Sequence, residues 1–167
     1  GGGRGAGTTT AALLMGGAST AAPSDVSDET EEYNGTSWTE VADLNEARGN
    51  AAGYGTQTAA HFVGGNTPPT NTAKTEIYNG TSWTEVGDLN TAQYGIAGAG
   101  SISAGMKFGA DLPPSKGGET EEYDGTSWTE VADLSTARGL LAGAMASPST
   151  TSLAMGGREP AKSVATE

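Results

Sequence analysis

Residues 33–41 read Tyr-Asn-Gly-Thr-Ser-Trp-Thr-Glu-Val, and the same phrase returns at residues 78–86 and, with Asp in place of Asn, at residues 123–131. Successive copies are 45 residues apart. A fixed period of about 20 to 50 residues marks a repeat architecture, in which each repeat is one supersecondary unit. The phrase therefore decides the fold before any other feature of the chain.

Each copy of the phrase carries a turn signal directly after its tyrosine. Asn-Gly and Asp-Gly supply the positive φ that both central positions of a type I′ hairpin turn need. We therefore expect one strand to end at each tyrosine and the next to run through the tryptophan to the following leucine. The residues concerned are Tyr33, Tyr78 and Tyr123, the turns Asn34-Gly35, Asn79-Gly80 and Asp124-Gly125, and Leu44, Leu89 and Leu134.

Two of these turns, at Asn34 and Asn79, also fit the N-glycosylation pattern Asn-x-Thr. The third copy has Asp124 instead, which keeps the turn signal and loses the glycosylation pattern. Turn chemistry explains all three copies and glycosylation explains two, so we interpret these residues as turn formers.

A segment that ends in glycine occurs four times and predicts a strand with one core face. Side chains alternate between the two faces of a strand. The residue before the glycine and the residue two positions earlier are mostly large and apolar, so we expect both to be buried. The residue between them varies in type, and we expect it to meet a more variable environment. The triplets are Leu13-Leu14-Met15, His61-Phe62-Val63, Met106-Lys107-Phe108 and Leu153-Ala154-Met155.

Small residues such as Ala51-Ala52-Gly53 precede this strand and suit a crowded innermost strand. Four short strands in each unit, with turns at glycines, are typical of a propeller blade. The order of a double glycine, a tyrosine and a tryptophan in each unit resembles the kelch family, and this resemblance covers nearly the whole chain. The double glycines are Gly16-Gly17, Gly64-Gly65 and Gly156-Gly157.

The resemblance implies an all-β fold of kelch-like β-propeller blades, each with four antiparallel strands. The blades would span approximately residues 1–45, 46–90, 91–135 and 136–167, and the last would be incomplete. One departure is Gly109-Ala110, where the second glycine is missing, and we expect a distorted turn there.

The phase of the repeat predicts an incomplete ring. Propellers close with about 4 to 8 blades, whereas 167 residues hold about 3.7 periods. Thr166-Glu167 aligns with Thr120-Glu121, just before a tyrosine and a tryptophan would follow. We therefore expect either part of a longer propeller or a unit that other chains complete.

Composition argues against several classes of function. The formal net charge is −12, from 20 acidic and 8 basic residues, so a nucleic-acid backbone would be repelled. There is no cysteine, which excludes disulfides and thiolate metal sites. No apolar run approaches the roughly 20 residues that span a bilayer, so we expect no membrane insertion.

His61 is the one histidine of the chain. Its column holds leucine and methionine in the other units, so we expect a core position and not a catalytic one. A single histidine and no cysteine exclude a galactose-oxidase-like copper site, and Asp124 directly before Gly125 does not match a sialidase-like Asp box. No nucleophile, base and orienting group can be assembled. We therefore predict no enzyme, no catalytic residues and no cofactor.

One column repeats a glutamate, and another repeats a long polar side chain. Carboxylates around a ring could bind cations, since Ca²⁺ takes oxygen ligands, but no Asp-x-Asp-x-Asp-Gly loop is present. We favour the alternatives, a repeated Glu–Arg contact or solvent exposure. The columns are Glu31, Glu76 and Glu121, and Arg48, Gln93 and Arg138.

The repeated phrase is also similar to repeat-rich proteins of marine bacteriophages and uncultured viruses. This similarity implies a non-enzymatic structural or adhesion protein, a virion or extracellular component such as a fibre, spike or capsid decoration. Its partners would be other subunits or a host receptor or glycan. The alternative is a cellular kelch-type module that binds proteins. Loops on a rigid scaffold commonly carry binding, so we look to the variable segments 18–28, 66–73 and 111–118.

Overall fold

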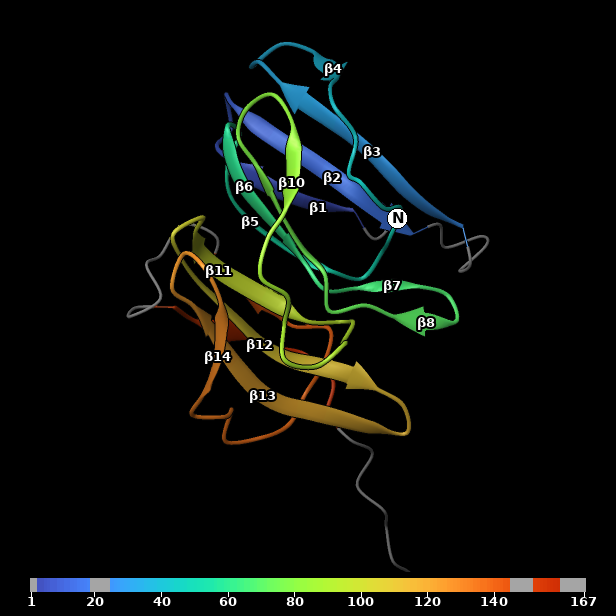
Figure 1. The fold of residues 1–167 in the computed structure, drawn as a ribbon, viewed down its shortest axis with the longest axis vertical. Coiled ribbons are helices and arrows are strands. Elements are labelled where there is room, and N and C mark those ends of the chain that lie inside the picture. The colour runs from blue at the N-terminus through green and yellow to red at the C-terminus, as the bar shows by residue number, and fades with distance from the viewer. Residues whose placement is uncertain (1–2, 19–24, 145–151, 160–167) are drawn as a thin grey trace, which may run out of the picture.

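The computed structural model describes residues 3–18, 25–144 and 152–159, and these residues form strands, turns and loops without a helix (Figure 1). Three four-stranded antiparallel sheets follow one another along the chain. Sheet 1 contains β1 (Arg4–Gly7), β2 (Ala12–Ala18), β3 (Val26–Tyr33) and β4 (Trp38–Glu40). Sheet 2 contains β5 (Ala52–Thr56), β6 (Ala59–Val63), β9 (Thr75–Tyr78) and β10 (Trp83–Glu85). Sheet 3 contains β11 (Ala97–Ser101), β12 (Ala104–Leu112), β13 (Ser115–Tyr123) and β14 (Trp128–Val131).

Two smaller sheets complete the described part of the chain. The hairpin of β7 (Asn66–Thr67) and β8 (Thr70–Asn71) lies between β6 and β9 in the sequence, and β15 (Ala142–Gly143) pairs with β16 (Ala154–Met155). The prediction of an all-β fold with four antiparallel strands in each repeat is confirmed for the three complete sheets. No ring of sheets closes within the described residues. The end of the fourth unit, including Thr166 and Glu167, lies outside them.

The sheets stack through their first strands, and β5 lies between β1 and β11. Small residues make this approach possible, as the Ala51-Ala52-Gly53 stretch predicts. A Cβ atom at Gly98 would lie 2.7 Å from the ring of Tyr54 on the neighbouring sheet. Glycine at this point of β11 therefore lets the large buried tyrosine fill the space between two sheets.

The turn after each tyrosine differs from the predicted type I′ turn. Tyr33 pairs with Trp38, so four residues lie between the strands instead of two. Gly35 has a positive φ of 91°, whereas Asn34 is not among the residues with positive φ. The side-chain oxygen of Asn34 accepts hydrogen bonds from the backbone N–H groups of Thr36 and Ser37, each at 3.0 Å. Since a side chain closes the loop, a second positive φ is not needed.

The strand through each tryptophan is shorter than predicted. β4 ends at Glu40 and does not continue to Leu44. Asp43 accepts a hydrogen bond from the backbone N–H of Thr30 at 3.3 Å, which is a donor that a longer β4 could have used. Leu44 is buried nonetheless in the core between sheets 1 and 2, and its backbone N–H bonds to the carbonyl of Asp28 of β3.

The missing second glycine at Ala110 does not distort a turn, contrary to the prediction. β12 runs on through this residue, and the ladder with β13 shifts between Phe108 and Ala110. The first glycine carries the unusual backbone, since Gly109 has a φ of 65° and a Cβ there would lie 2.4 Å from the carbonyl oxygen of Arg138. In sheet 3 the first glycine is therefore required and alanine replaces the second, whereas in sheet 2 the second glycine, Gly65, has a φ of 101° and a Cβ there would lie 2.6 Å from the carbonyl oxygen of Gly49.

The prediction of one core face holds for sheet 1 and is wrong for sheets 2 and 3. Leu13 and Met15 are buried while Leu14 between them is 38% exposed. The residues that correspond to Leu14, Phe62 and Lys107, are both fully buried. Their faces are covered by the preceding sheet, so sheets 2 and 3 have two buried faces. In the fourth unit Leu153 and Met155 are exposed, contrary to the prediction for their columns.

Candidate functional site

Two of the variable segments, residues 66–73 and 111–118, form ordered hairpins, where we expected loops. Between β6 and β9 the separate hairpin β7–β8 turns at Pro68-Pro69, with Thr67 paired to Thr70. In sheet 3 the extended ends of β12 and β13 turn at Pro113-Pro114. Figure 1 shows both hairpins on the same side of the molecule. Of the third variable segment, residues 18–28, the part from 19 to 24 lies outside the described residues.

Each hairpin is held at its base by the segment that leaves the preceding sheet. We name these segments connector 1 (residues 41–51), connector 2 (residues 86–96) and connector 3 (residues 132–141). Gly49 of connector 1 exchanges two backbone hydrogen bonds with Asn66, at 3.0 and 2.9 Å. In connector 2, the carbonyl of Tyr94 accepts from the backbone N–H of Asp111 at 2.8 Å. The hairpins therefore have fixed bases, and their proline tips reach solvent, with Pro69, Pro113 and Pro114 exposed.

His61 is fully buried, as its column predicts. Its Nδ1 lies 2.6 Å from the hydroxyl oxygen of Tyr54, and its ring meets the rings of Tyr54 and Tyr123 edge-on, with centroids 5.0 Å apart in each case. Burial lowers the pKa of His61 to about 4, so the ring is neutral at pH 7. Its surroundings are those of a packed core residue between sheets 2 and 3.

The Glu–Arg contact, which we expected to repeat, occurs once among the described residues, between sheets 1 and 2. Arg48 and Glu76 are both buried, and Nη1 of Arg48 lies 2.5 Å from Oε1 of Glu76. Arg48 also donates from Nε to the carbonyl of Gly64 at 3.1 Å and from Nη2 to that of Phe62 at 3.3 Å. The other oxygen of Glu76 accepts from the backbone and the side chain of Asn45, at 2.8 and 2.6 Å. Every polar group of this buried pair therefore has a partner.

Glu121, the equivalent of Glu76 between sheets 2 and 3, is paired with a different cation. The connector residue there is Gln93, and the cation comes instead from Lys107, whose Nζ lies 3.6 Å from Glu121. Burial lowers the pKa of Lys107, and the nearby Glu121 and Glu119 oppose that shift. Asn90 repeats the role of Asn45 and donates its backbone and side-chain N–H groups to Glu121 at 2.9 and 2.7 Å. Position 107, for which the sequence predicted a variable environment, therefore carries a buried charge that pairs with Glu121.

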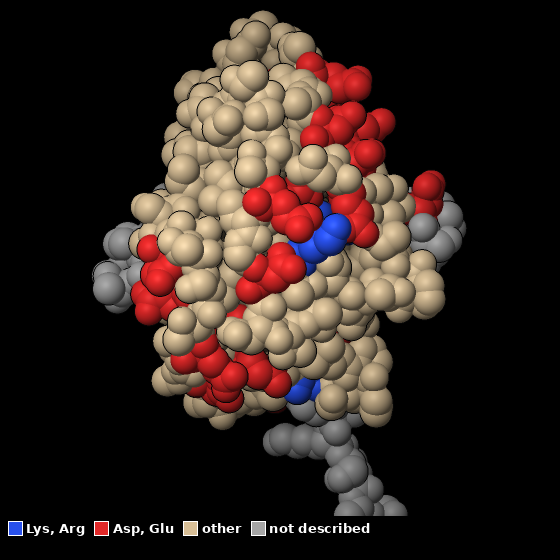
Figure 2. Space-filling model, viewed as in Figure 1, with Lys and Arg blue, Asp and Glu red and all other residues tan. Residues whose placement is uncertain are grey.

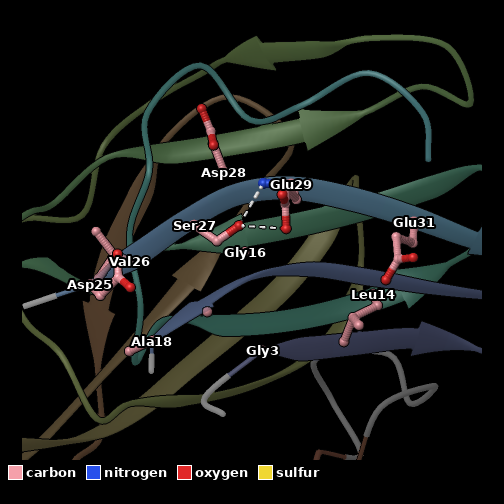
Figure 3. A pocket seen from close by; sticks show the side chains of 11 residues that line it. Gly3, Leu14, Gly16, Ala18, Asp25, Val26, Ser27, Asp28, Glu29 and Glu31 are labelled. Carbon is pink, nitrogen blue, oxygen red and sulfur yellow. Dashed lines mark hydrogen bonds between the residues drawn. The ribbon is translucent and has the colours of Figure 1, made fainter. Parts of the chain in front are cut away.

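Glu31 is the member of the glutamate column that has no sheet in front of it among the described residues. It lines an open hollow of about 720 Å³ on sheet 1, together with residues of β2, β3 and the segment before β1 (Figure 3). Within this hollow Ser27 bonds to Glu29, and Glu31 stands opposite Leu14 in the β2–β3 ladder. The lining is Gly3, Leu14, Gly16, Gly17, Ala18, Asp25, Val26, Ser27, Asp28, Glu29 and Glu31.

The surface around these sites is strongly acidic. Figure 2 shows Asp and Glu side chains gathered in several groups on one face of the molecule, with few Lys and Arg side chains among them. Within residues 3–18, 25–144 and 152–159, no group of three or more His, Asp or Glu side chains is placed to hold a metal ion. The described strands and loops also include no helix long and apolar enough to cross a membrane.

Comparison with known proteins adds no relative from which a role could be carried over. No family model matches the chain, and no curated protein matches its sequence.

Proposed function

We propose that this chain is a non-enzymatic structural or adhesion protein, built from kelch-like β-propeller blades in an incomplete ring. One observation carries the proposal. The residues that repeat build the sheets and their contacts, whereas two segments that differ between repeats form the Pro-Pro hairpins on one side of the molecule. A constant scaffold with variable, exposed tips is the usual arrangement of a binding protein.

The anchoring of the hairpins supports this role. A tip whose base is hydrogen-bonded to the backbone of the preceding connector loses little conformational freedom when a ligand binds, and such preorganisation favours affinity. The tips also differ in character, because the tip at Pro68-Pro69 is flanked by threonines and that at Pro113-Pro114 by Leu112 and Ser115. Neighbouring repeats thus offer different contacts to a receptor, a glycan or another subunit.

We further propose that the protein belongs to a virion, as a phage fibre, spike or capsid decoration. The support is the similarity of the repeated phrase to repeat-rich phage proteins. A chain with a net charge of −12 would repel packaged nucleic acid, which agrees with a place on the outside of the particle. The second candidate is a cellular kelch-type module that binds proteins.

Binding of the purified chain to glycan arrays and to host cells would test the role of the hairpins. Replacing Pro68-Pro69 or Pro113-Pro114 by Asn-Gly keeps a two-residue turn and removes the proline tip. We expect these exchanges to abolish binding, whereas the control Thr81→Ala, in the turn at the opposite end of β9, should leave it intact. Binding that survives both tip exchanges would contradict the proposal.

The virion assignment is tested separately. Mass spectrometry of purified particles should find this chain at a stoichiometry expected of a structural component. Its recovery from cell extract with adaptor proteins, and its absence from particles, would favour the cellular module.

A further inference from the structure

The hollow on sheet 1 corresponds to the place that Arg48 occupies on sheet 2. On sheet 2 the guanidinium of Arg48 contacts Gly64, Phe62 and Glu76. Those residues align with Gly16, Leu14 and Glu31 of sheet 1, and all three line the hollow of about 720 Å³. The ladders agree with this alignment, because Phe62 stands opposite Glu76 just as Leu14 stands opposite Glu31.

The chain also indicates which side chain the hollow would take. Where the residue opposite the glutamate is Phe62, which has no charge, the connector brings an arginine, Arg48. Where the connector brings Gln93, the residue opposite the glutamate is Lys107. Each buried glutamate therefore meets one cation, either from the connector or from its own sheet. Leu14 brings no charge, so Glu31 is suited to an incoming arginine and not to a glutamine.

A second contact of the repeat is open on the same face. Trp83 donates a hydrogen bond from its indole Nε1 to Oγ1 of Thr30 on the preceding sheet at 3.2 Å, and Trp128 does the same to Thr75. Trp83 and Trp128 are 7% and 5% exposed, whereas Trp38 is 47% exposed. Trp38 and Leu14 line a second, apolar hollow of about 270 Å³. Among the described residues, nothing gives the open face the apolar cover and the threonine acceptor that sheets 2 and 3 receive from the preceding sheet, or the arginine that sheet 2 receives from connector 1.

We propose that this face of sheet 1 is a docking site for a further β-sheet unit of the same repeat type, and that the acidic hollow binds the arginine of its connector. The occupant is defined by its chemistry. It carries a connector with asparagine or serine three residues before an arginine, as in residues 45–48 and 135–138 of this chain. Asp25, Asp28 and Glu29 add negative charge around the hollow and favour the approach of such a cation. This surface is separate from the hairpin tips, so the inference does not depend on the proposed binding role of the hairpins.

The arginine would make a set of contacts already seen in the molecule. Its guanidinium would donate to the carboxylate of Glu31 and to the carbonyl oxygens of Gly16 and Leu14, as Arg48 does to Glu76, Gly64 and Phe62. Bonds between a guanidinium and a carboxylate are stronger and more directional than neutral ones. The carboxylate should therefore contribute a large share of the affinity.

NMR titration of the ¹⁵N-labelled chain tests the proposal. The probe is a synthetic peptide with the sequence of residues 41–50, which contains the Asn-Glu-Ala-Arg-Gly connector, and the matched control peptide has glutamine in place of the arginine. We expect shift changes at the amides of Leu14, Gly16, Gly17 and Glu31 with the arginine peptide, and about tenfold weaker binding of the glutamine peptide.

Protein variants complete the test. Glu31→Gln should weaken the arginine peptide on the order of tenfold, whereas Glu130→Gln, an exposed change on β14, should leave the affinity unchanged. The dispersion of the amide spectrum verifies that each variant is folded. Three results would overturn the proposal: no shift changes at these amides at millimolar peptide, equal binding of both peptides, or equally tight binding of N-acetyl-arginine amide, which would indicate a site for small guanidinium ligands.

Discussion

Replacing Arg48 by methionine should destabilise the contact between sheets 1 and 2 by about 3 kcal/mol. Breaking a buried ion pair by removing one partner costs about 3–5 kcal/mol, because the other charge stays buried without its counterion. Arg48 and Glu76 are both buried, which places the pair in this class. Asn45 continues to donate two hydrogen bonds to Glu76 in the variant, so the lower end of the range applies. Methionine retains most of the apolar stem and creates little empty space.

The repeat supplies a matched control for this substitution. Arg138 occupies the same position in connector 3, but its side chain is only partly buried and donates from Nη1 to the carbonyl of Gly156 at 3.1 Å. No ion pair is found for it within the described residues. Arg138→Met should therefore cost less than about 1 kcal/mol.

Urea denaturation followed by tryptophan fluorescence measures both variants. Trp83 packs 6.5 Å from the ring of Phe62 at the affected contact, so its emission reports on that contact. The double variant Arg48→Met/Glu76→Gln removes the stranded charge and should recover part of the loss, which a double-mutant cycle quantifies. If Arg48→Met cost no more than Arg138→Met, or if the two changes at Arg48 and Glu76 were additive, the buried pair would not hold the sheets together.

Three further predictions concern single positions. Burial lowers the pKa of His61 to about 4, so the unfolded chain binds more protons than the folded chain. The free energy of unfolding should therefore rise by roughly 3 kcal/mol between about pH 4 and 6.5 and stay constant above that range. In urea denaturation at several pH values, the His61→Phe variant should lack this rise. Backbone hydrogen bonds from Ser127 and Thr126 lower the pKa of Asp124. The contribution of Asp124 to stability should therefore be present above its unfolded pKa and be lost as the pH falls through its folded pKa, which a carbon-detected NMR titration locates. The Asp124→Asn variant should be stable without this pH dependence. Gly109→Ala should cost at least about 2 kcal/mol in urea unfolding, because the residue has positive φ and meets a backbone carbonyl, whereas Ala110→Gly should cost about 1 kcal/mol or less; equal costs would contradict the role given to the first glycine.

The periodicity of the sequence predicted the features that are set within one repeat, without the neighbouring sheet. The strand ends at Tyr33, Tyr78 and Tyr123 are in place, and the burial of His61 followed from the residues in its column. Alignment of columns works here because Leu13 and His61 are both buried on the face toward the following sheet, although Met106 in the same column of sheet 3 is only partly buried. The length of the turn after each tyrosine was missed, although the sequence contains a signal for it. Asn or Asp followed by Thr-Ser allows the side-chain oxygen to accept two backbone N–H groups, and this alternative competes with the type I′ turn.

The middle column was misjudged because the pattern of one strand cannot reveal what the neighbouring sheet covers. Leu14, Phe62 and Lys107 differ so much in type that they suggest variable surroundings. In the structure both are buried, Phe62 beneath Arg48 of connector 1 and Lys107 beside Glu121 of its own sheet. Phe62 lies under the guanidinium of Arg48, 5.0 Å from its carbon, so an aromatic ring there packs against the cation.

The exchange of Arg48 and Phe62 for Gln93 and Lys107 shows that the repeat preserves charge balance at a buried glutamate and not the residue at any one position. A lysine in the middle column and an arginine on the connector would place two cations beside one carboxylate, and a phenylalanine with a glutamine would leave that carboxylate without a cation. Both combinations carry an unpaired buried charge, which costs several kcal/mol. The two columns must therefore be read as a pair across a sheet boundary. Leu14 at the open face supplies no charge, so the same pairing predicts an arginine on the unit that docks against Glu31, and connector residues 45–48 describe such a unit.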